Sequence, residues 1–417
     1  MNQVWLFSTR FVPALLGALV TRGVVWYASA TAPAAVIPSQ APSAEPGLHH
    51  FEVLSAEPVV TESTTPVDGL SERSFGEASA VRHGERVYLA VESHELGESA
   101  RQVRILSSRD EVEWRQEYAF PNTDAGNPKL LELGADLFVY TTSHHFGEVG
   151  ENQATRLDAN GIWHDPVSLN LGGQELSQVK VVDGVPLMTT YTAAEGIYRF
   201  ESNEREVRIL TSKDGIDWHA PSAGKWAVYK GGGSDASFTS NDDGSLLAVV
   251  RKEAGDSQGW GSSVCMAAAS NWTDWDCVND TRNYGAAAMF SYDGETYLVG
   301  QRKVGDDPNY DLGHSVGFLR TLQNQFSELS AGRRCALYRY VATEKRIAYV
   351  GDLPSRGDTC NPAVIPGSQP GQFVVYTPTS ALDGPDQPVV RAHEASNRLY
   401  RYVISLSRER TTSTVGY

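Results

Sequence analysis

A fourteen-residue stretch occurs twice in this chain and restricts the folds it can adopt. Residues 205–218 read REVRILTSKDGIDW and residues 101–114 read RQVRILSSRDEVEW, with eight of the fourteen positions identical. Each copy has the alternation of a β-strand, followed by a polar turn that ends in tryptophan. Because a recurring supersecondary unit usually sets the architecture of a whole chain, the repeat has to be explained first.

A β-hairpin pattern recurs six times from residue 51 onward and gives the period of the repeat. Each hairpin has an apolar strand, a turn, and a second strand rich in Tyr, Leu and Val. The turns are His83-Gly84, Leu133-Gly134, Asp183-Gly184, Asp243-Gly244, Asp293-Gly294 and the longer Pro366 to Gly371. The second strands lie at 87–93, 137–143, 185–191, 245–251, 296–302 and 373–379. The early hairpins are about 50 residues apart, so the two copies of the long stretch are two units apart.

Units of three or four antiparallel strands repeated around an axis are the blades of a β-propeller. Six hairpins predict an all-β, six-bladed β-propeller over residues 51–417, with the strand near residues 51–60 completing the last blade. Third strands are predicted at residues 313–322 and 397–406. A five-bladed propeller with an extra hairpin is the alternative, because the last step is near 77 residues and has an insertion around 331–358.

The first fifty residues differ from the rest of the chain. An apolar run at 11–20 followed by small residues at 28–35 is typical of a signal peptide, or of an N-terminal anchor, over residues 1–32. No uninterrupted apolar run of ~18 residues or more is present to span a bilayer. Residues 33–50, rich in Pro, Ala and Ser, predict a flexible linker. We therefore expect an exported protein, extracellular or periplasmic.

The charge balance excludes one class of partner. Thirty-five basic and 51 acidic residues give a net charge of −16. Such a chain is soluble and lacks the basic surface that nucleic acid requires. A small anionic ligand is not excluded, because it needs only a local cluster of arginines. We expect a monomer without a cofactor.

Four cysteines fall into two close pairs, Cys265 with Cys277 and Cys335 with Cys360. No CxxC spacing or His-rich neighbourhood accompanies them, which argues against a zinc site, and no metal is predicted. In an exported chain an even number of cysteines predicts two local disulfides. Four buried thiols are the alternative.

The turn that closes the repeated stretch has a physical explanation. Asp214 can accept backbone N–H bonds within its own turn, and Gly215 tolerates the positive φ that such a turn requires. Trp218 then provides a large apolar cap over the edge of the blade. A feature that recurs from blade to blade is more typical of a structural fastening than of a ligand site.

This turn resembles the Asp-box of neuraminidase-type (BNR) repeats. The matching residues are Ser212-x-Asp214-Gly215-x-x-Trp218 and, with Glu111 in place of glycine, Ser108-x-Asp110-x-x-x-Trp114. In sialidases and related six-bladed propellers such boxes lie at the periphery, away from the active site. The resemblance therefore implies a sialidase-like propeller and directs the search for a site to the central channel.

The innermost strand of every blade begins at the mouth of that channel. Counting back about eleven residues from the second strands places polar residues at most inner-strand starts. These are Glu77, Asn127, Glu175 or Gln178, Asp235 and Asp358 in blades 1, 2, 3, 4 and 6, whereas blade 5 has Gly285 and Ala286. Carboxylates at such positions are candidates for acid–base catalysis. The alternative is that each one caps its own turn.

Blade 4 carries the most specific resemblance to sialidases. Residues 232–251 match a segment in which a Glu opens the inner strand and an Arg ends the second strand, and Asp235 and Arg251 stand at these places. Arg302 resembles the next arginine of the family, and Tyr376 resembles its nucleophile. The resemblance implies that Asp235 activates Tyr376, while the two arginines bind a sugar carboxylate.

Blade 1 departs from the family pattern. No Phe-Arg-Ile-Pro stretch is present, and Arg73 lies a few residues from the place of the missing arginine. Asp235 is one methylene shorter than the Glu of the family. The catalytic acid would lie in the loop after the second strand of blade 1, where Glu95 and Glu98 are the candidates.

The sequence thus predicts an exported sialidase-like glycoside hydrolase that cleaves a terminal sugar from a glycan, an acidic sugar if the arginines bind it. One alternative is a carbohydrate-binding or interaction propeller without catalysis. Another is a glycosidase for neutral sugars that uses Glu77, Asp235 and Asp358 as plain acid–base carboxylates, with the arginines paired to channel acids. The distinguishing feature is whether the Tyr376 hydroxyl lies within hydrogen-bond distance of Asp235.

Overall fold

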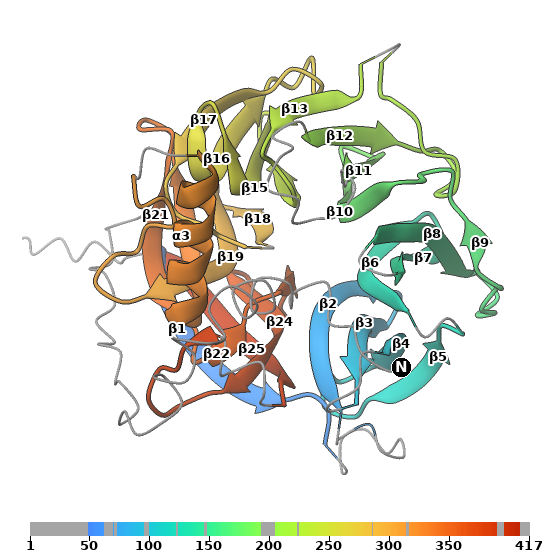
Figure 1. The fold of residues 1–417 in the computed structure, drawn as a ribbon. Helices are drawn as coiled ribbons and strands as arrows, with labels where there is room; N and C mark the ends of the chain where they lie inside the picture. Colours follow the sequence, from blue (N-terminus) through green and yellow to red (C-terminus); the bar gives the residue numbers. More distant parts are fainter. Residues whose placement is uncertain are drawn as a thin grey trace, which may run out of the picture.

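The computed structural model describes residues 49–61, 70, 73–95, 100–121, 124–145, 148–192, 205–222, 225–285, 287–313, 317–389 and 396–408. These residues form six antiparallel sheets arranged in a ring (Figure 1). The predicted six-bladed β-propeller is confirmed. The predicted signal peptide, most of the predicted linker, Glu98 and Ala286 lie outside the described residues.

Each of the first five blades is a four-stranded sheet in which sequence order runs from the axis outward. Blade 1 contains β2 (Ser74–His83), β3 (Arg86–His94), β4 (Arg101–Ser108) and β5 (Arg115–Ala119). Blade 2 contains β6 (Ala125–Leu133), β7 (Asp136–His145), β8 (Glu148–Leu157) and β9 (Val167–Ser168). Blade 3 contains β10 (Gln174–Val182), β11 (Val185–Thr192), β12 (Arg205–Thr211) and β13 (Ala227–Gly231).

The remaining blades follow the same plan with two changes. Blade 4 contains β14 (Ala236–Ser240), β15 (Leu246–Asp256), β16 (Gly259–Ala267) and β17 (Asp276–Asp280). Blade 5 contains β18 (Ala288–Tyr292), β19 (Glu295–Val304), β20 (Gly332–Val341) and β21 (Arg346–Asp352), with helix α3 (Gly317–Ser330) between β19 and β20. Blade 6 contains β22 (Arg356–Thr359), β23 (Ala363–Pro366), β24 (Gln372–Ala381), β25 (Arg398–Arg408) and β1 (His49–Pro58).

The ring is closed by its N-terminal strand. β1 pairs antiparallel with β25, from His49 opposite Arg408 to Pro58 opposite Tyr400, and forms the outer strand of blade 6. The predicted completion of the last blade by this strand is therefore confirmed. The strand begins at His49, two residues before the predicted start of the domain at residue 51.

The second strand of each blade forms the core, because it is covered on both faces by neighbouring blades. Leu89, Val139, Leu187, Leu247 and Val299 have no exposed surface. Strands buried on both faces read as continuous apolar runs rather than as alternating ones. This explains why the second strands are the clearest signal in the sequence.

The repeated turn forms the hydrogen bonds that its sequence predicts. The Asp214 carboxylate accepts bonds from the backbone N–H groups of Ile216 and Asp217, both at 2.9 Å. The Trp218 indole donates to the Gly215 carbonyl at 3.1 Å, and Gly215 has φ of +77°. In blade 1 the corresponding Asp110 carboxylate accepts from the N–H groups of Val112 and Glu113, both at 2.9 Å.

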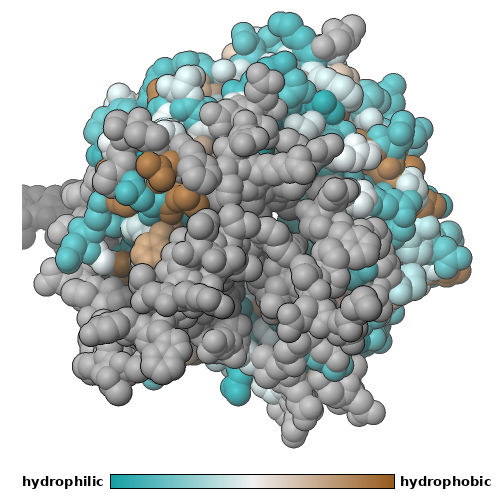
Figure 2. All heavy atoms as spheres, viewed as in Figure 1, coloured by the Kyte–Doolittle hydropathy of each residue, from teal (hydrophilic) through white to brown (hydrophobic). Residues whose placement is uncertain are grey.

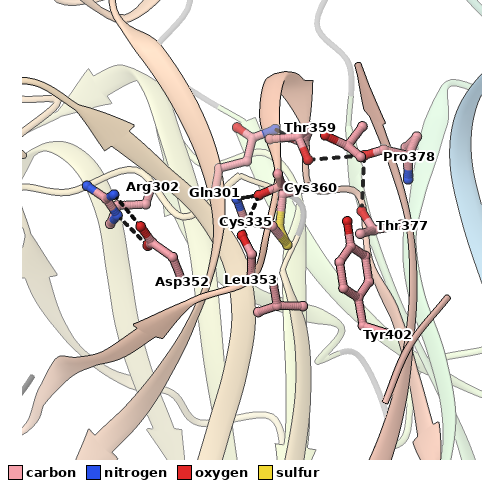
Figure 3. Close-up of a disulfide and its surroundings, with 12 residues drawn as sticks. Gln301, Arg302, Cys335, Asp352, Leu353, Thr359, Cys360, Thr377, Pro378 and Tyr402 are labelled. Carbon is pink, nitrogen blue, oxygen red and sulfur yellow. Dashed lines mark hydrogen bonds and ion pairs between the residues drawn. A yellow bond between two sulfur atoms is a disulfide. The ribbon is translucent and has the colours of Figure 1, made fainter. Parts of the chain in front are cut away.

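Both predicted disulfides are present, so the four cysteines are not free thiols. Cys265 and Cys277 face each other on the neighbouring strands β16 and β17. Cys335 in β20 is bonded to Cys360, which follows β22, so this disulfide joins blade 5 to blade 6 (Figure 3).

The long last step of the repeat is explained by a helix and not by the predicted insertion at 331–358. Residues 332–359 contain blade strands β20, β21 and β22, whereas α3 occupies part of the segment where a strand at 313–322 was predicted. The other predicted third strand, at 397–406, is confirmed as β25.

Figure 2 shows hydrophobic spheres over α3, where Leu319 and Phe326 are 52% and 59% exposed. No helix among the described residues is long and apolar enough to cross a membrane.

Candidate active site

A cavity of about 340 Å³ lies on the axis of the ring and is lined by the inner strands of all six blades. Glu77, Asn127, Gln178 and Asp235 all belong to its lining, as expected for residues at the starts of inner strands. In blade 6, however, the lining residues are Asn361 to Val364, and not Asp358. The cavity volume lies within the range of small-ligand pockets, roughly 300–1,000 Å³.

Glu77 is paired with a lysine of the next blade. Its carboxylate lies 3.1 Å from the Lys129 ammonium, and its side chain is 31% exposed. Burial by the channel wall raises the pKa of Glu77, and the Lys129 charge opposes this rise. The negative charges of Glu92 and Asp235 raise this pKa further. Glu77 is therefore a carboxyl group whose protonated form is favoured by its surroundings.

Asp235 is paired with an arginine of its own blade. The Arg251 guanidinium lies 3.4 Å from the Asp235 carboxylate and 3.4 Å from the Glu253 carboxylate. Burial raises the pKa of Asp235, Arg251 opposes the rise, and the Glu175 charge adds to it. Asp235 thus lies at the channel, as predicted. The charge of its partner Arg251 is shared between the carboxylates of Asp235 and Glu253.

Asn127 links blade 2 to blade 3 at the channel wall. It has φ of +51°, a left-handed conformation that asparagine tolerates better than most residues. Its side-chain amide donates to the Glu175 carboxylate at 2.9 Å and to the Leu176 carbonyl, while its carbonyl oxygen accepts from Lys129. Asn127 therefore holds Lys129 beside Glu77.

Two charged residues near this site were not predicted from the sequence, namely Lys129 and Glu92. The Glu92 side chain is 7% exposed and forms an ion pair with Arg101 at 3.1 Å. A Cβ atom at Gly76 or Gly126 would lie only 2.9 or 2.7 Å from a Glu92 carboxylate oxygen. The two inner-strand glycines therefore make room for this carboxylate, and their presence in the sequence was the available signal.

Tyr376 does not pair with Asp235. Its hydroxyl donates to the Glu111 carboxylate at 2.8 Å, and its ring packs edge-on against Trp114, with centroids 5.8 Å apart. Tyr376 is fully buried between blades 6 and 1, outside the cavity lining. Burial, followed by the Glu111 charge, raises the pKa of Tyr376 well above its usual range. The predicted nucleophile therefore lies in a blade interface.

Three other predicted site residues also lie outside the cavity lining. The Arg302 guanidinium forms two bonds with the Asp352 carboxylate, at 2.7 and 2.6 Å (Figure 3). Its side chain is only 5% exposed. Arg73 and Glu95 pair with each other at 3.0 Å. The cavity lining does not include Arg302, Arg73 or Glu95.

Asp358, another predicted carboxylate, does not line the cavity and already has protein partners. Its carboxylate accepts a bond from the Asn397 amide at 3.4 Å and lies 4.0 Å from the Arg333 guanidinium. The structure thus brings Glu77, Asn127 and Asp235 together, with Arg251 against Asp235. Within the described part of the chain, no group of three or more His, Cys, Asp or Glu side chains is arranged to hold a metal ion.

Comparisons with known proteins identify the fold. No protein-family model and no curated protein matches the sequence. Among solved structures, a protein of unknown function from Dyadobacter fermentans aligns with a TM-score of 0.55 and 11% identity, over 85% of this chain and 99% of that one.

Sialidases are also among the similar structures. Trypanosoma rangeli sialidase in complex with the inhibitor DANA aligns with a TM-score of 0.53 and 14% identity, over 79% of this chain and 55% of that one. The same sialidase in another structure gives a TM-score of 0.53 and 13% identity, over 79% and 55%. This chain therefore spans about half the length of the sialidase it resembles. The similarity shows that the two share the six-bladed propeller fold.

Proposed function

We propose that this propeller hydrolyses a glycosidic bond of a glycan at its axial cavity, with Glu77 and Asp235 as the reacting carboxylates. The observation that carries the proposal is that both side chains line one cavity of about 340 Å³ and that burial raises the pKa of each. Glycoside hydrolysis typically uses two such carboxyl groups, one protonated and one ionised. The fold shared with a sialidase supports the same class of reaction.

The surroundings of the two carboxylates favour different roles. The pKa of Asp235 is also raised, by burial and by the charges of Glu175 and Glu253, but the permanently charged Arg251 lies beside Asp235 and favours its ionised form. Glu77 has a lysine as its partner, and the neighbouring charges of Glu92 and Asp235 favour its protonated form. Glu77 is therefore assigned as the general acid and Asp235 as the base or nucleophile. Pairs of carboxyl groups with unlike surroundings divide the two roles in this way.

The arginines support a neutral sugar as the substrate. Arg302 is held in a two-point ion pair with Asp352, and Arg251 lies between Asp235 and Glu253. Binding a sugar carboxylate at either arginine would require it to give up a protein carboxylate. A neutral terminal sugar, held by hydrogen bonds, requires no such exchange.

A binding role without hydrolysis is the second candidate. The observation in its favour is that Glu77 and Asp235 each already contact a cation, at 3.1 and 3.4 Å. Such pairs can also orient a bound glycan through hydrogen bonds without reacting.

We also propose that the protein is exported, because its two disulfides require an oxidising compartment to form and persist.

A panel of fluorogenic glycosides with neutral and acidic terminal sugars tests these proposals. We expect hydrolysis of a neutral glycoside that is lost in Glu77→Gln and Asp235→Asn but retained in Tyr376→Phe, the matched control from the blade interface. Glycan binding without hydrolysis of any member would support the binding role instead. Hydrolysis that is retained in both carboxylate variants would contradict the assigned residues.

A further inference from the structure

One lysine of the cavity lining has no role in the proposed reaction. Lys180 lies on β10 in blade 3, is half-buried, and belongs to the lining. Its ammonium group donates a hydrogen bond to the Met289 carbonyl on β18. This hydrogen bond links blade 3 to blade 5, and the inner strand of blade 4 contacts the inner strands of both.

Lys180 differs from the other enclosed lysines in its charge partner. Lys129 lies 3.1 Å from the Glu77 carboxylate, and Lys252 lies 3.2 Å from the Asp256 carboxylate. Among the described residues, the polar group that Lys180 contacts is the Met289 carbonyl, and no carboxylate pairs with it. A neutral carbonyl offsets only part of the cost of burying a positive charge.

The cavity wall around this lysine is partly apolar. The lining includes Val81, Leu131, Val179, Met289 and Val364, one or more from most inner strands. Its other ionisable residues are Glu77, Lys129, Glu132 and Asp235. Burial lowers the pKa of Lys180 to about 8. At pH 7 such an amine is neutral roughly 200-fold more often than an exposed lysine with a pKa of about 10.4.

We propose that Lys180 is a reactive amine that condenses with small aldehydes, such as the open-chain form of an aldose, that enter the axial cavity. Desolvation of a lysine in an apolar pocket is a recognised route to such reactivity, because only the neutral amine carries the free electron pair. The inference does not depend on the proposed hydrolysis, since any small aldehyde that reaches the cavity can react.

The reaction balances without an added oxidant or reductant. The amine nitrogen forms a bond to the aldehyde carbon, and one N–H proton moves to the aldehyde oxygen to give a carbinolamine. Loss of the resulting hydroxyl, with the second N–H proton, forms the C=N bond of the imine and releases one water molecule. Solvent water carries both proton transfers.

Reductive trapping tests the proposal in the full-length protein. The protein is incubated at pH 7 with glyceraldehyde and sodium cyanoborohydride, which reduces an imine to a stable secondary amine, and labelled lysines are located by peptide mass mapping. We expect Lys180 to be labelled at least about ten-fold faster than the exposed Lys213 and the buried, carboxylate-paired Lys252. The Lys180 labelling rate should rise with pH and level off above about 8.

Two outcomes would overturn the proposal. One is labelling of Lys213 at a rate equal to or above that of Lys180, and the other is no labelling of Lys180 at all. The Lys180→Arg variant keeps the charge and a donor for the Met289 carbonyl, and it should lose the fast label while its other lysines react unchanged. Because the comparison among lysines is made within the wild-type protein, the test does not depend on this variant folding.

Discussion

The hydroxyl of Tyr376 donates a hydrogen bond of 2.8 Å to the carboxylate of Glu111, across the junction between the last blade and the first. The same Glu111 carboxylate accepts bonds from Arg401 at 2.9 Å and from Arg82 at 2.8 Å. Tyr140 has the matching place in blade 2, where its hydroxyl donates to the Gly215 carbonyl of blade 3 at 2.9 Å. Each tyrosine therefore fastens its blade to the repeated turn of the next.

Removing the Tyr376 hydroxyl should destabilise the ring without affecting catalysis. Tyr376→Phe removes one hydrogen-bond donor from the buried, ionised Glu111 carboxylate. The loss of a hydrogen bond to a charged group typically costs about 1.5–3 kcal/mol of folding stability. Tyr140→Phe, the matched control, loses a bond to a neutral carbonyl and should cost about 0.5–1.5 kcal/mol. Chemical denaturation measures both. A smaller loss for Tyr376→Phe than for Tyr140→Phe would contradict the role assigned to Glu111.

Glu111 occupies the turn position at which blade 3 has Gly215, and it has φ of +61°. Both Glu111→Ala and Glu111→Gly remove the bonds to Tyr376, Arg401 and Arg82. Only alanine keeps the cost of a left-handed conformation, about 1–2 kcal/mol. Both variants should be less stable than wild type, with alanine the lower of the two by about 1 kcal/mol. Equal stability of the two variants in denaturant titrations would show that the left-handed turn is not retained.

Stability at acid pH should depend on Asp293, which joins blade 5 to the closing strands. Its carboxylate lies 2.6 Å from the Arg408 guanidinium and 3.1 Å from the His49 ring. Arg408, and then His49, lower the pKa of Asp293 to about 2, below its value of about 3.9 in an unfolded chain. The stabilisation is therefore present above pH ~4 and is lost as the pH falls towards 2.

Thermal unfolding between pH 2 and pH 6 tests this dependence. Asp293→Asn should lower the melting temperature above pH ~4 and should converge with wild type as the pH approaches 2. A melting-temperature difference that stays constant over this range would mean that the ionised form of Asp293 is not what stabilises the junction.

The two disulfides should contribute unequally. Cys335–Cys360 closes a separation of 25 residues and joins two blades, whereas Cys265–Cys277 closes 12 residues within one blade. In the chain-entropy model the longer loop is worth about 0.6 kcal/mol more, on a total of about 2–4 kcal/mol for each disulfide. Paired Cys→Ser variants, compared by denaturant titration, measure the difference. A larger loss from the intra-blade pair would contradict this order.

The blade pattern could be predicted from the sequence because its causes are local. Second strands are buried on both faces, so they read as apolar runs, and tight turns require residues such as Gly244 and Gly294, with φ of +76° and +81°. Residues 313–322 were interpreted as a strand, although Leu319, Leu322, Phe326 and Leu329 recur at the spacing of a helix. This apolar stripe does not mark the packed face of α3, because Asn324 and Glu328 are buried whereas Leu319 and Phe326 are more than half exposed.

The candidate site was only partly predictable. The repeat places Glu77 and Asp235 at inner-strand starts, so their position follows from the period. Tyr376 was assigned by resemblance, although LFVYTT in blade 2 and FVVYTP in blade 6 already place Tyr140 and Tyr376 at matching positions. The role of Lys129 depends on a contact between blades 1 and 2, which no local pattern encodes.

The pH dependence of kcat/KM for a neutral glycoside, in wild type and in Glu77→Gln, tests the central claim most directly. The wild type should lose activity on an alkaline limb whose apparent pKa lies above the usual value of about 4.3 for Glu. Glu77→Gln should abolish this limb and lower kcat/KM by about 100-fold or more. A substrate whose leaving group needs no proton should be much less affected. An unchanged alkaline limb and rate in Glu77→Gln would contradict the account.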